Sequence, residues 1–167
     1  MGVDEHREKA PTSVEFAVIT VSDTRSEADD HSGKAIIEVM SSHGHRCISK
    51  VIVRDEVLEI QRALREFIEA PAVKAVIING GTGVAKRDVT LEALEEYQEK
   101  AIPGFGELFR ALSFQEIGSA AMVSRACAFV SEGKPVFCLP GSKNAVTLAV
   151  SRLVAPELGH LVWEANR

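Results

Sequence analysis

An alternation of strand-like and helix-like segments constrains the fold of this chain more than any other feature of its sequence. Runs rich in β-branched residues predict strands over residues 15–21, 45–53 and 73–78. Between these strands, apolar residues recur at helical spacing over residues 32–43 and 57–68. Because strands and helices that alternate in this way form parallel sheets with right-handed crossovers, the sequence predicts an α/β fold.

The second half of the chain predicts further helices and a pair of neighbouring strands. The two strands flank Glu132-Gly133-Lys134, so they form either a hairpin with a glycine turn or two adjacent strands of one sheet. Pro156 is expected to break the last helical pattern into two. The predicted elements are helices over residues 91–97, 103–117, 145–154 and 157–165, and strands over residues 127–131 and 135–139.

An acidic residue follows each of the first three predicted strands. Asp23 follows the first strand, Asp55 the second and Asp88 the third. In a parallel sheet the loops after the strands lie on one edge, so we expect these carboxylates to converge. A single acidic residue in a loop is usually solvated surface, but three of them on one edge favour a ligand site. Asp88 offers the kind of oxygen ligand that Mg²⁺ prefers.

A glycine loop follows the third strand, with Gly80, Gly81, Thr82 and Gly83 in succession. Glycines let the backbone turn sharply and approach a ligand closely, because no Cβ atom stands in the way. Free backbone N–H groups in such a loop suit phosphate oxygens. The spacing matches neither the Walker A loop nor Gly-x-Gly-x-x-Gly, so the local pattern predicts an anion site without specifying the ligand.

Charge and composition exclude several classes of partner. The chain has 167 residues and a net charge of −5, from 24 acidic and 19 basic residues, which argues against nucleic acid as a partner. The three cysteines form no Cys-x-x-Cys pair, which indicates reduced thiols in a cytoplasmic protein. The N-terminus lacks the apolar segment of a signal peptide, and no apolar run is long enough to span a membrane. We predict a flexible tail over residues 1–13 and a single domain over residues 14–167.

Several short motifs, in this order and spacing, are specific in combination although each is weak alone. On these motifs the chain, from about residue 18 to its C-terminus, resembles the MoaB/Mog family of molybdenum cofactor biosynthesis, a domain also found in plant Cnx proteins and animal gephyrin. The motifs are Thr20-Val-Ser22-Asp23-Thr24-Arg25, Asp29-Asp30-x-Ser32-Gly33, Val53-x-Asp55-Glu56, Asn79-Gly-Gly-Thr-Gly83, Arg87-Asp88-Val-Thr90, Pro103-Gly-Phe-Gly-Glu107, Ser124-Arg125-Ala126 and Leu139-Pro-Gly-Ser142.

The resemblance implies a fold, an assembly and a reaction. The fold is a three-layer α/β/α domain whose mostly parallel sheet has an antiparallel edge. The assembly is a homotrimer or a hexamer made of two trimers, with contacts to other cofactor-biosynthesis enzymes. The ligand is molybdopterin, whose terminal phosphate in Mog-like members attacks the α-phosphorus of ATP. This Mg²⁺-dependent reaction gives adenylylated molybdopterin and pyrophosphate.

The resemblance also assigns roles to residues. Asp55 and Asp88 match the family's acidic positions, and they are the expected catalytic residues and Mg²⁺ ligands. One position departs from the commoner pattern, because Arg54 stands where many relatives have proline, which leaves the exact placement of Asp55 open. The expected binding residues for nucleotide, phosphate and pterin are Ser22, Asp23, Gly80, Gly81, Thr82, Gly83, Thr90, Pro140, Gly141, Ser142 and Lys143.

Two alternatives stay open from the sequence. Some MoaB-type members bind the ligand without adenylylating it, so the chain could be a binding or scaffold protein, although its two acids favour an enzyme. His43, His45 and Cys47 could instead contribute to a metal site, but no distant fourth ligand is evident. Arg110 and Arg125 are expected to be ion-pair partners at the surface or at a subunit contact, with a substrate role as the alternative.

Overall fold

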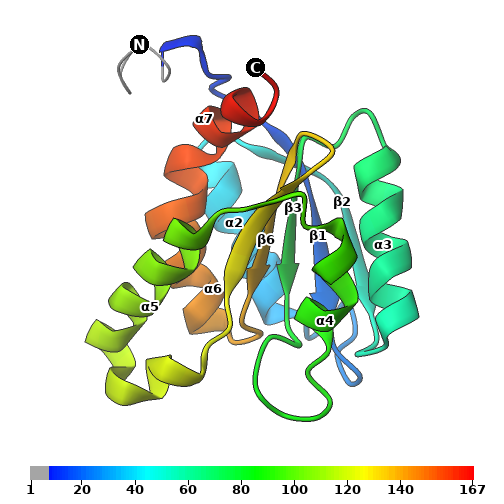
Figure 1. The fold of residues 1–167 in the computed structure, drawn as a ribbon, viewed down its shortest axis with the longest axis vertical. Helices are drawn as coiled ribbons and strands as arrows, with labels where there is room; N and C mark the ends of the chain where they lie inside the picture. The colour runs from blue at the N-terminus through cyan, green and yellow to red at the C-terminus, as the bar shows by residue number, and fades with distance from the viewer. Residues whose placement is uncertain (1–7) are drawn as a thin grey trace.

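A computed structural model describes residues 8–167 and contains one six-stranded mixed sheet (Figure 1). The order of the strands is β2-β1-β3-β6-β5-β4, with parallel pairing from β2 to β6 and antiparallel pairing from β6 to β4. The predicted parallel sheet with an antiparallel edge is therefore confirmed. The strands are β1 Glu15–Val21, β2 Arg46–Val53, β3 Ala75–Asn79, β4 Lys100–Ala101, β5 Cys127–Ser131 and β6 Lys134–Leu139.

Helices cover both faces of the sheet, which gives the predicted three-layer arrangement (Figure 1). One face is covered by α3 and α4, and the other by α2, α5, α6 and α7. The helices are α2 His31–Ser42, α3 Val57–Glu69, α4 Thr90–Leu94, α5 Pro103–Ile117, α6 Lys143–Ala149 and α7 Ala155–Ala165.

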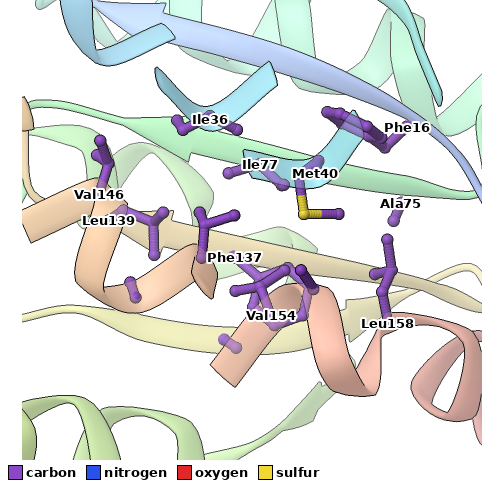
Figure 2. Packing of buried hydrophobic residues seen from close by; sticks show 14 of the residues in the cluster. Phe16, Ile36, Met40, Ala75, Ile77, Phe137, Leu139, Val146, Val154 and Leu158 are labelled. Carbon is purple, nitrogen blue, oxygen red and sulfur yellow. The ribbon is translucent and has the colours of Figure 1, made fainter. Parts of the chain in front are cut away.

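The two faces of the sheet hold separate apolar cores. In β1, Phe16 and Val18 point to the core beneath α2 and α6, while Ala17 and Ile19 point to the core beneath α3. This alternation follows from the two-residue period of a strand, and a strand covered on both faces needs apolar residues throughout. Figure 2 shows the first core, where Met40 of α2 lies near Ile77 and Phe137 of the sheet.

Pro156 does not break the last helix, which corrects the prediction. A π-helical segment, Val150–Val154, joins α6 to α7, so that helix continues over Lys143–Ala165. Proline lacks an N–H donor, but here it lies in the first turn of α7, directly after a segment whose hydrogen bonds already shift by one residue. The helix is long and apolar enough to span a membrane. Its apolar residues, however, pack against the sheet as those of a core helix do.

Two short elements near the antiparallel edge were not predicted. The strand β4 is only two residues long, too short for a sequence pattern to indicate. A six-residue 3-10 helix, Gly118–Val123, continues the chain after α5. The flexible tail is predicted over residues 1–13, of which residues 1–7 lie outside the described residues. Within the described part, Pro11 packs its backbone against Gly159 of α7.

Candidate functional site

A cavity of about 600 Å³ lies at the edge of the sheet where β1, β2, β3 and β6 end. In Figure 1 this edge is at the bottom of the view, where the loop between β3 and α4 extends below the sheet. Strand-end loops form one side of the cavity, and α5 with the following 3-10 helix forms the other. The lining residues are Val21, Ser22, Thr24, Arg25, Asp55, Gly80, Gly81, Thr82, Gly83, Asp88, Phe109, Ser113, Ile117, Ala120, Val123, Ser124, Pro140, Gly141, Ser142 and Ala145.

The glycine loop, residues 80–83, needs glycine at its first two positions. Gly80 has a φ of 99° and Gly81 a φ of 66°, in the left-handed region that side chains rarely adopt. A Cβ atom on Gly80 would overlap the Val21 carbonyl oxygen, and one on Gly81 would overlap the Thr90 hydroxyl. The loop therefore lies against β1 on one side and against the start of α4 on the other.

Side-chain and backbone donors fix the carbonyl groups of the glycine loop. Thr90 Oγ1 donates to the Gly80 carbonyl at 2.9 Å, and Thr90 N donates to the Gly81 carbonyl at 3.0 Å. Arg125 Nε donates to the Gly83 carbonyl at 2.8 Å. Within residues 8–167, the amides of Gly81, Thr82 and Gly83 have no hydrogen-bond acceptor. These three N–H groups are thus available to an anion, as the loop pattern predicts.

Asp55 and Asp88 both rest against the glycine loop and share the cavity. A Cβ atom on Gly81 would lie 3.1 Å from Asp55 Oδ1, and one on Gly83 would lie 2.6 Å from Asp88 Oδ2. Asp88 is oriented by its own turn, because its Oδ2 accepts from the Ala85 amide at 2.9 Å. Burial raises the pKa of Asp55, and the nearby carboxylates of Asp23 and Asp88 raise it further. This excess of negative charge favours a bound cation.

Asp23 lies next to Asp55 but outside the lining of the cavity. Arg87 donates to both of its carboxylate oxygens, at 2.7 and 2.9 Å, and these bonds lower the pKa of Asp23. Asp23 Oδ1 also accepts from the Asp55 amide at 3.2 Å. Asp23 therefore holds the backbone at Asp55, and its own charge is paired at the surface.

The turn at Arg54 is fixed although it lacks the commoner proline. The Arg54 amide donates to Glu59 Oε2 at 3.0 Å, and the Glu56 amide donates to the Arg54 carbonyl at 2.7 Å. A proline at this position could not make the first of these bonds, because it has no N–H group. A hydrogen bond to α3 thus replaces the stiffness that proline would supply.

A second loop, residues 140–142 and here called the proline loop, lines the cavity directly beside the glycine loop. The Gly141 carbonyl accepts from Arg25 Nη2 at 2.8 Å and from Ser32 Oγ at 2.6 Å. Ser142 caps α6 by accepting from the Ala145 amide at 3.2 Å. Arg25 is the one cation among the cavity-lining residues of the described chain, and sequence reasoning had used it only as part of a motif.

A buried carboxylate lies behind the proline loop. Asp30 accepts from the Thr20 hydroxyl at 2.8 Å and from the Gly33 amide at 2.9 Å, and it forms an ion pair with Lys50 at 2.9 Å. Although burial alone would raise the pKa of Asp30, the bonds from Lys50, Gly33 and Thr20 hold it below its usual range. Asp30 caps α2, which carries Ser32 to the Gly141 carbonyl.

The chain resembles a known family in sequence along its length. The family model described as "Probable molybdopterin binding domain" matches residues 17–160. This chain belongs to that molybdopterin-binding domain family. Molybdenum cofactor biosynthesis protein B of Halalkalibacterium halodurans is 47% identical over 98% of this chain and 97% of its own length. The protein of the same name from Bacillus subtilis is also 47% identical, over 100% of this chain and 99% of its own length.

Solved structures of the family share the fold. A crystal structure of a molybdenum cofactor biosynthesis protein B has a TM-score of 0.91 at 46% identity, covering 95% of this chain and 99% of that one. The tungsten cofactor synthesizing protein MoaB from Pyrococcus furiosus has a TM-score of 0.86 at 37% identity, covering 95% and 100%. The resemblance to the MoaB/Mog family and the three-layer fold are thereby confirmed.

The structure brings most of the predicted site residues of this family member together. The predicted residues that line the cavity are Ser22, Asp55, Gly80, Gly81, Thr82, Gly83, Asp88, Pro140, Gly141 and Ser142. Three others lie outside the lining. Thr90 is buried behind the glycine loop, Asp23 is paired with Arg87, and Lys143 is exposed in the first turn of α6.

The sequence did not predict that α5 and the following 3-10 helix form one wall of the cavity. Phe109, Ser113 and Ile117 face the cavity from α5, and Ala120 and Val123 face it from the 3-10 helix. Their spacing of four residues in α5 signals one helical face.

The described residues give little support to a metal site at His43, His45 and Cys47, or to a substrate role for Arg110 and Arg125. His45 accepts from the Val14 amide and bonds to the Ala155 carbonyl, and residues 8–167 contain no group of three or more potential metal ligands. Arg125 pairs with Glu92, as expected of an ion-pair partner, but it also braces the glycine loop. Arg110 donates to the Ala126 carbonyl at 3.0 Å.

Proposed function

We propose that this chain acts in molybdenum cofactor biosynthesis, binding molybdopterin and ATP in the cavity and transferring AMP to molybdopterin. The observation that carries the proposal is the convergence of Asp55 and Asp88 on the glycine loop, within one cavity. In the reaction, an oxygen of the molybdopterin phosphate forms a bond to the α-phosphorus of ATP. The bond from that phosphorus to the bridging oxygen breaks, and pyrophosphate leaves.

The chemistry requires two anions to approach each other. Bringing a phosphate oxygen to a triphosphate is opposed by charge repulsion, so the site must supply positive charge and N–H donors. The free amides of Gly81, Thr82 and Gly83 donate to phosphate oxygens. Arg25 supplies positive charge beside the proline loop. Since the substrate phosphate is the nucleophile, no side chain needs to act as one.

Asp55 and Asp88 fit a Mg²⁺ site. Both offer carboxylate oxygens, and burial followed by the nearby carboxylates raises the pKa of Asp55, an unfavourable charge that a cation would stabilise. Two protein carboxylates suffice for Mg²⁺, which keeps several waters and takes further oxygens from substrate phosphates. When bound there, Mg²⁺ would neutralise phosphate charge. Asp88 is held ready by its bond from Ala85, and Asp55 by the backbone contact with Asp23.

The apolar wall suits the ring systems of the substrates. Phe109, Ile117 and Val123 give the cavity a surface for a flat ring, and Ser113 and Ser124 add polar groups beside it. On this proposal, Ser22, Pro140, Gly141 and Ser142 contact the pterin side, and the glycine loop contacts the nucleotide phosphates.

We also propose that the chain assembles as a homotrimer or hexamer. The helix α5 and the following 3-10 helix expose Phe114 by 61% and Met122 by 79%, and these two side chains line one surface pocket. Apolar side chains grouped in this way mark interaction surfaces. Sedimentation equilibrium measures the assembly, and a monomer at micromolar concentration would contradict this part.

The alternative is a molybdopterin-binding or scaffold protein without catalysis. The test incubates purified protein with ATP, Mg²⁺ and molybdopterin and measures pyrophosphate and the adenylate. Formation of both above the rate without protein supports the enzyme. Tight binding of molybdopterin with background turnover would favour the scaffold.

A further inference from the structure

Two cysteines that are far apart in sequence lie opposite each other in the hairpin of β5 and β6. Cys127 pairs with Cys138, and the two-residue turn Glu132-Gly133 fixes this register. Directly opposed residues of an antiparallel pair point to the same face of the sheet. Sequence reasoning treated the thiols as separate, because only the register of the hairpin brings them together.

The Cα–Cα distance expected for this pair lies within the range that a disulfide allows. In a hairpin with a two-residue turn the flanking pair is hydrogen-bonded, and the class then alternates, so Cys127 and Cys138 are a hydrogen-bonded pair. Such pairs have Cα atoms about 5.5 Å apart, and disulfides need about 4.4–6.8 Å. Their Cβ atoms start slightly too far apart, so closure requires the strands to shift.

The surroundings of Cys127 favour its reaction with an oxidant. Cys127 is half-buried and lines a small cavity of about 160 Å³ together with Arg110, whereas Cys138 is fully buried. A hydrogen bond from Cys138 and the positive charges of Arg110 and Arg125 lower the pKa of the Cys127 thiol. Cys127 is therefore the attacking thiol, and Cys138 resolves the product.

We propose that Cys127 and Cys138 form a modification site, a reversible disulfide made by peroxide-class oxidants. The Cys127 thiolate attacks one peroxide oxygen, the O–O bond breaks, and the departing hydroxide takes a proton to become water. Cys138 then attacks the Cys127 sulfur of the sulfenic acid, the S–O bond breaks, and a second water leaves with the Cys138 proton. The two thiols are oxidised and the peroxide is reduced.

The disulfide would act on the cavity through the end of β6. Cys138 precedes Leu139, whose carbonyl accepts from the Gly80 amide at 3.0 Å, and Pro140 and Gly141 line the cavity. A shift of β6 that closes the S–S bond therefore loosens the contact between the proline loop and the glycine loop. This inference goes beyond the proposed function and holds whether or not AMP transfer takes place.

The site is tested on the full chain with hydrogen peroxide as the probe. After treatment, remaining thiols are blocked with N-ethylmaleimide, and intact mass and peptide mapping follow. The expected result is the loss of two hydrogens per chain, a peptide linking Cys127 to Cys138, one blocked thiol at Cys47, and full reversal by dithiothreitol. Three blocked thiols, or a link that joins two chains, would overturn the proposal.

Matched variants separate the pair from general thiol oxidation. Cys47 is also half-buried, but it lies on β2, near the opposite edge of the sheet, with only the Ser49 carbonyl as its thiol's partner. Cys47→Ser should keep the mass loss, and Cys127→Ser and Cys138→Ala should each abolish it. If Cys138→Ala folds poorly, the test rests on Cys127→Ser alone, because serine is nearly isosteric with cysteine and should preserve the fold.

The coupling to the cavity has its own readout. Hydrogen exchange compared between the reduced and oxidised wild type should show faster exchange at the Gly80 amide after oxidation. Reduction should restore the slow exchange, and Cys127→Ser should show no change with peroxide. Equal exchange in a protein that carries the mapped disulfide would refute the coupling.

Discussion

The glycine loop and the proline loop lie side by side along one cavity, and side-chain donors to backbone carbonyls hold both of them. In each loop a side-chain donor occupies a backbone carbonyl, which fixes the peptide planes. The glycine loop is braced by Arg125, whose side chain is 33% exposed and pairs with the more exposed Glu92. The proline loop is braced by Arg25 and Ser32, which sit beside the fully buried Asp30.

The difference indicates a division between chemistry and stability. The two carboxylates of the proposed metal site rest against the glycine loop, whose anchors lie near solvent. The proline loop depends on an ion pair inside the domain, so damage to its anchor should spread to the fold. Substitutions at the two loops should therefore affect different measurements.

The largest expected effect is on stability, at the anchor of the proline loop. Asp30→Asn removes the buried charge that pairs with Lys50 and leaves Lys50 only the exposed Glu27, and removing one member of a buried pair costs about 3–5 kcal/mol. Urea unfolding measures this loss. Glu27→Gln is the matched control, because Glu27 pairs with the same Lys50 but is 72% exposed. The control should cost less than about 1 kcal/mol, and equal losses would erase the distinction.

The same anchor predicts a pH dependence. The folded pKa of Asp30 lies below its unfolded value of about 3.9. Its contribution to stability is therefore complete above that value and is lost as the pH falls through the folded pKa. The difference between wild type and Asp30→Asn in free energy of unfolding should be constant near neutral pH and shrink below about pH 4. A constant difference down to the acid transition would contradict the ion-pair account.

The next effect is on activity, at the glycine loop. Asp88→Asn keeps an oxygen that accepts from the Ala85 amide but removes the charge, so AMP transfer should fall by about 10²–10³-fold. Molybdopterin binding and urea stability should change little. Isothermal calorimetry and pyrophosphate release measure the two quantities. Unchanged turnover would remove Asp88 from the proposed metal site.

Glycine-to-alanine substitutions compare the backbones of the two loops. Gly80→Ala should cost about 2–4 kcal/mol, because Gly80 has a positive φ and a Cβ atom would overlap the Val21 carbonyl. Gly141→Ala should cost less than about 1 kcal/mol, because its Cβ atom would meet only Gly80 Cα at 3.4 Å. Thermal unfolding ranks the two, and a reversed order would refute the described strain.

The smallest effect concerns the exposed brace. Arg125→Lys loses the planar fork that reaches the Gly83 carbonyl and Glu92 together, at a cost of about 1–2 kcal/mol. The effect should appear as faster hydrogen exchange across residues 81–90. Arg110→Lys serves as the control, since Arg110 bonds carbonyls outside the glycine loop. Similar changes in both variants would deny Arg125 a special role.

The sequence predicts the parts of the site that follow local rules. Asp55 and the glycine loop come directly after strands, and Asp88 lies further along the same connection as the glycine loop. Strand ends meet at one edge in any parallel sheet, so their convergence follows without coordinates. The proline loop lies at the same edge for the same reason, since it follows β6, which runs parallel to β3.

Parts that depend on long-range packing were not predictable. Asp30 is one of several acids after the first strand, and only its burial distinguishes it from the exposed Asp29. Thr90 is predicted to contact ligand, yet its hydroxyl donates a hydrogen bond to the Gly80 carbonyl. The wall from α5 depends on how the antiparallel edge returns the chain to the cavity, which no local pattern encodes.

The π-helical segment within the last helix sets the rotation of the chain around its axis. Apolar contacts to the sheet recur every four residues, at Val146, Val150, Val154 and Leu158. In a regular α-helix these 12 residues would drift by about 120° around the axis. The wider π-helical turn over Val150–Val154 holds about one extra residue, which offsets this drift. The apolar side chains therefore keep facing the strands. Deleting a single residue there would turn α7 by roughly 100° and expose Leu158 to water.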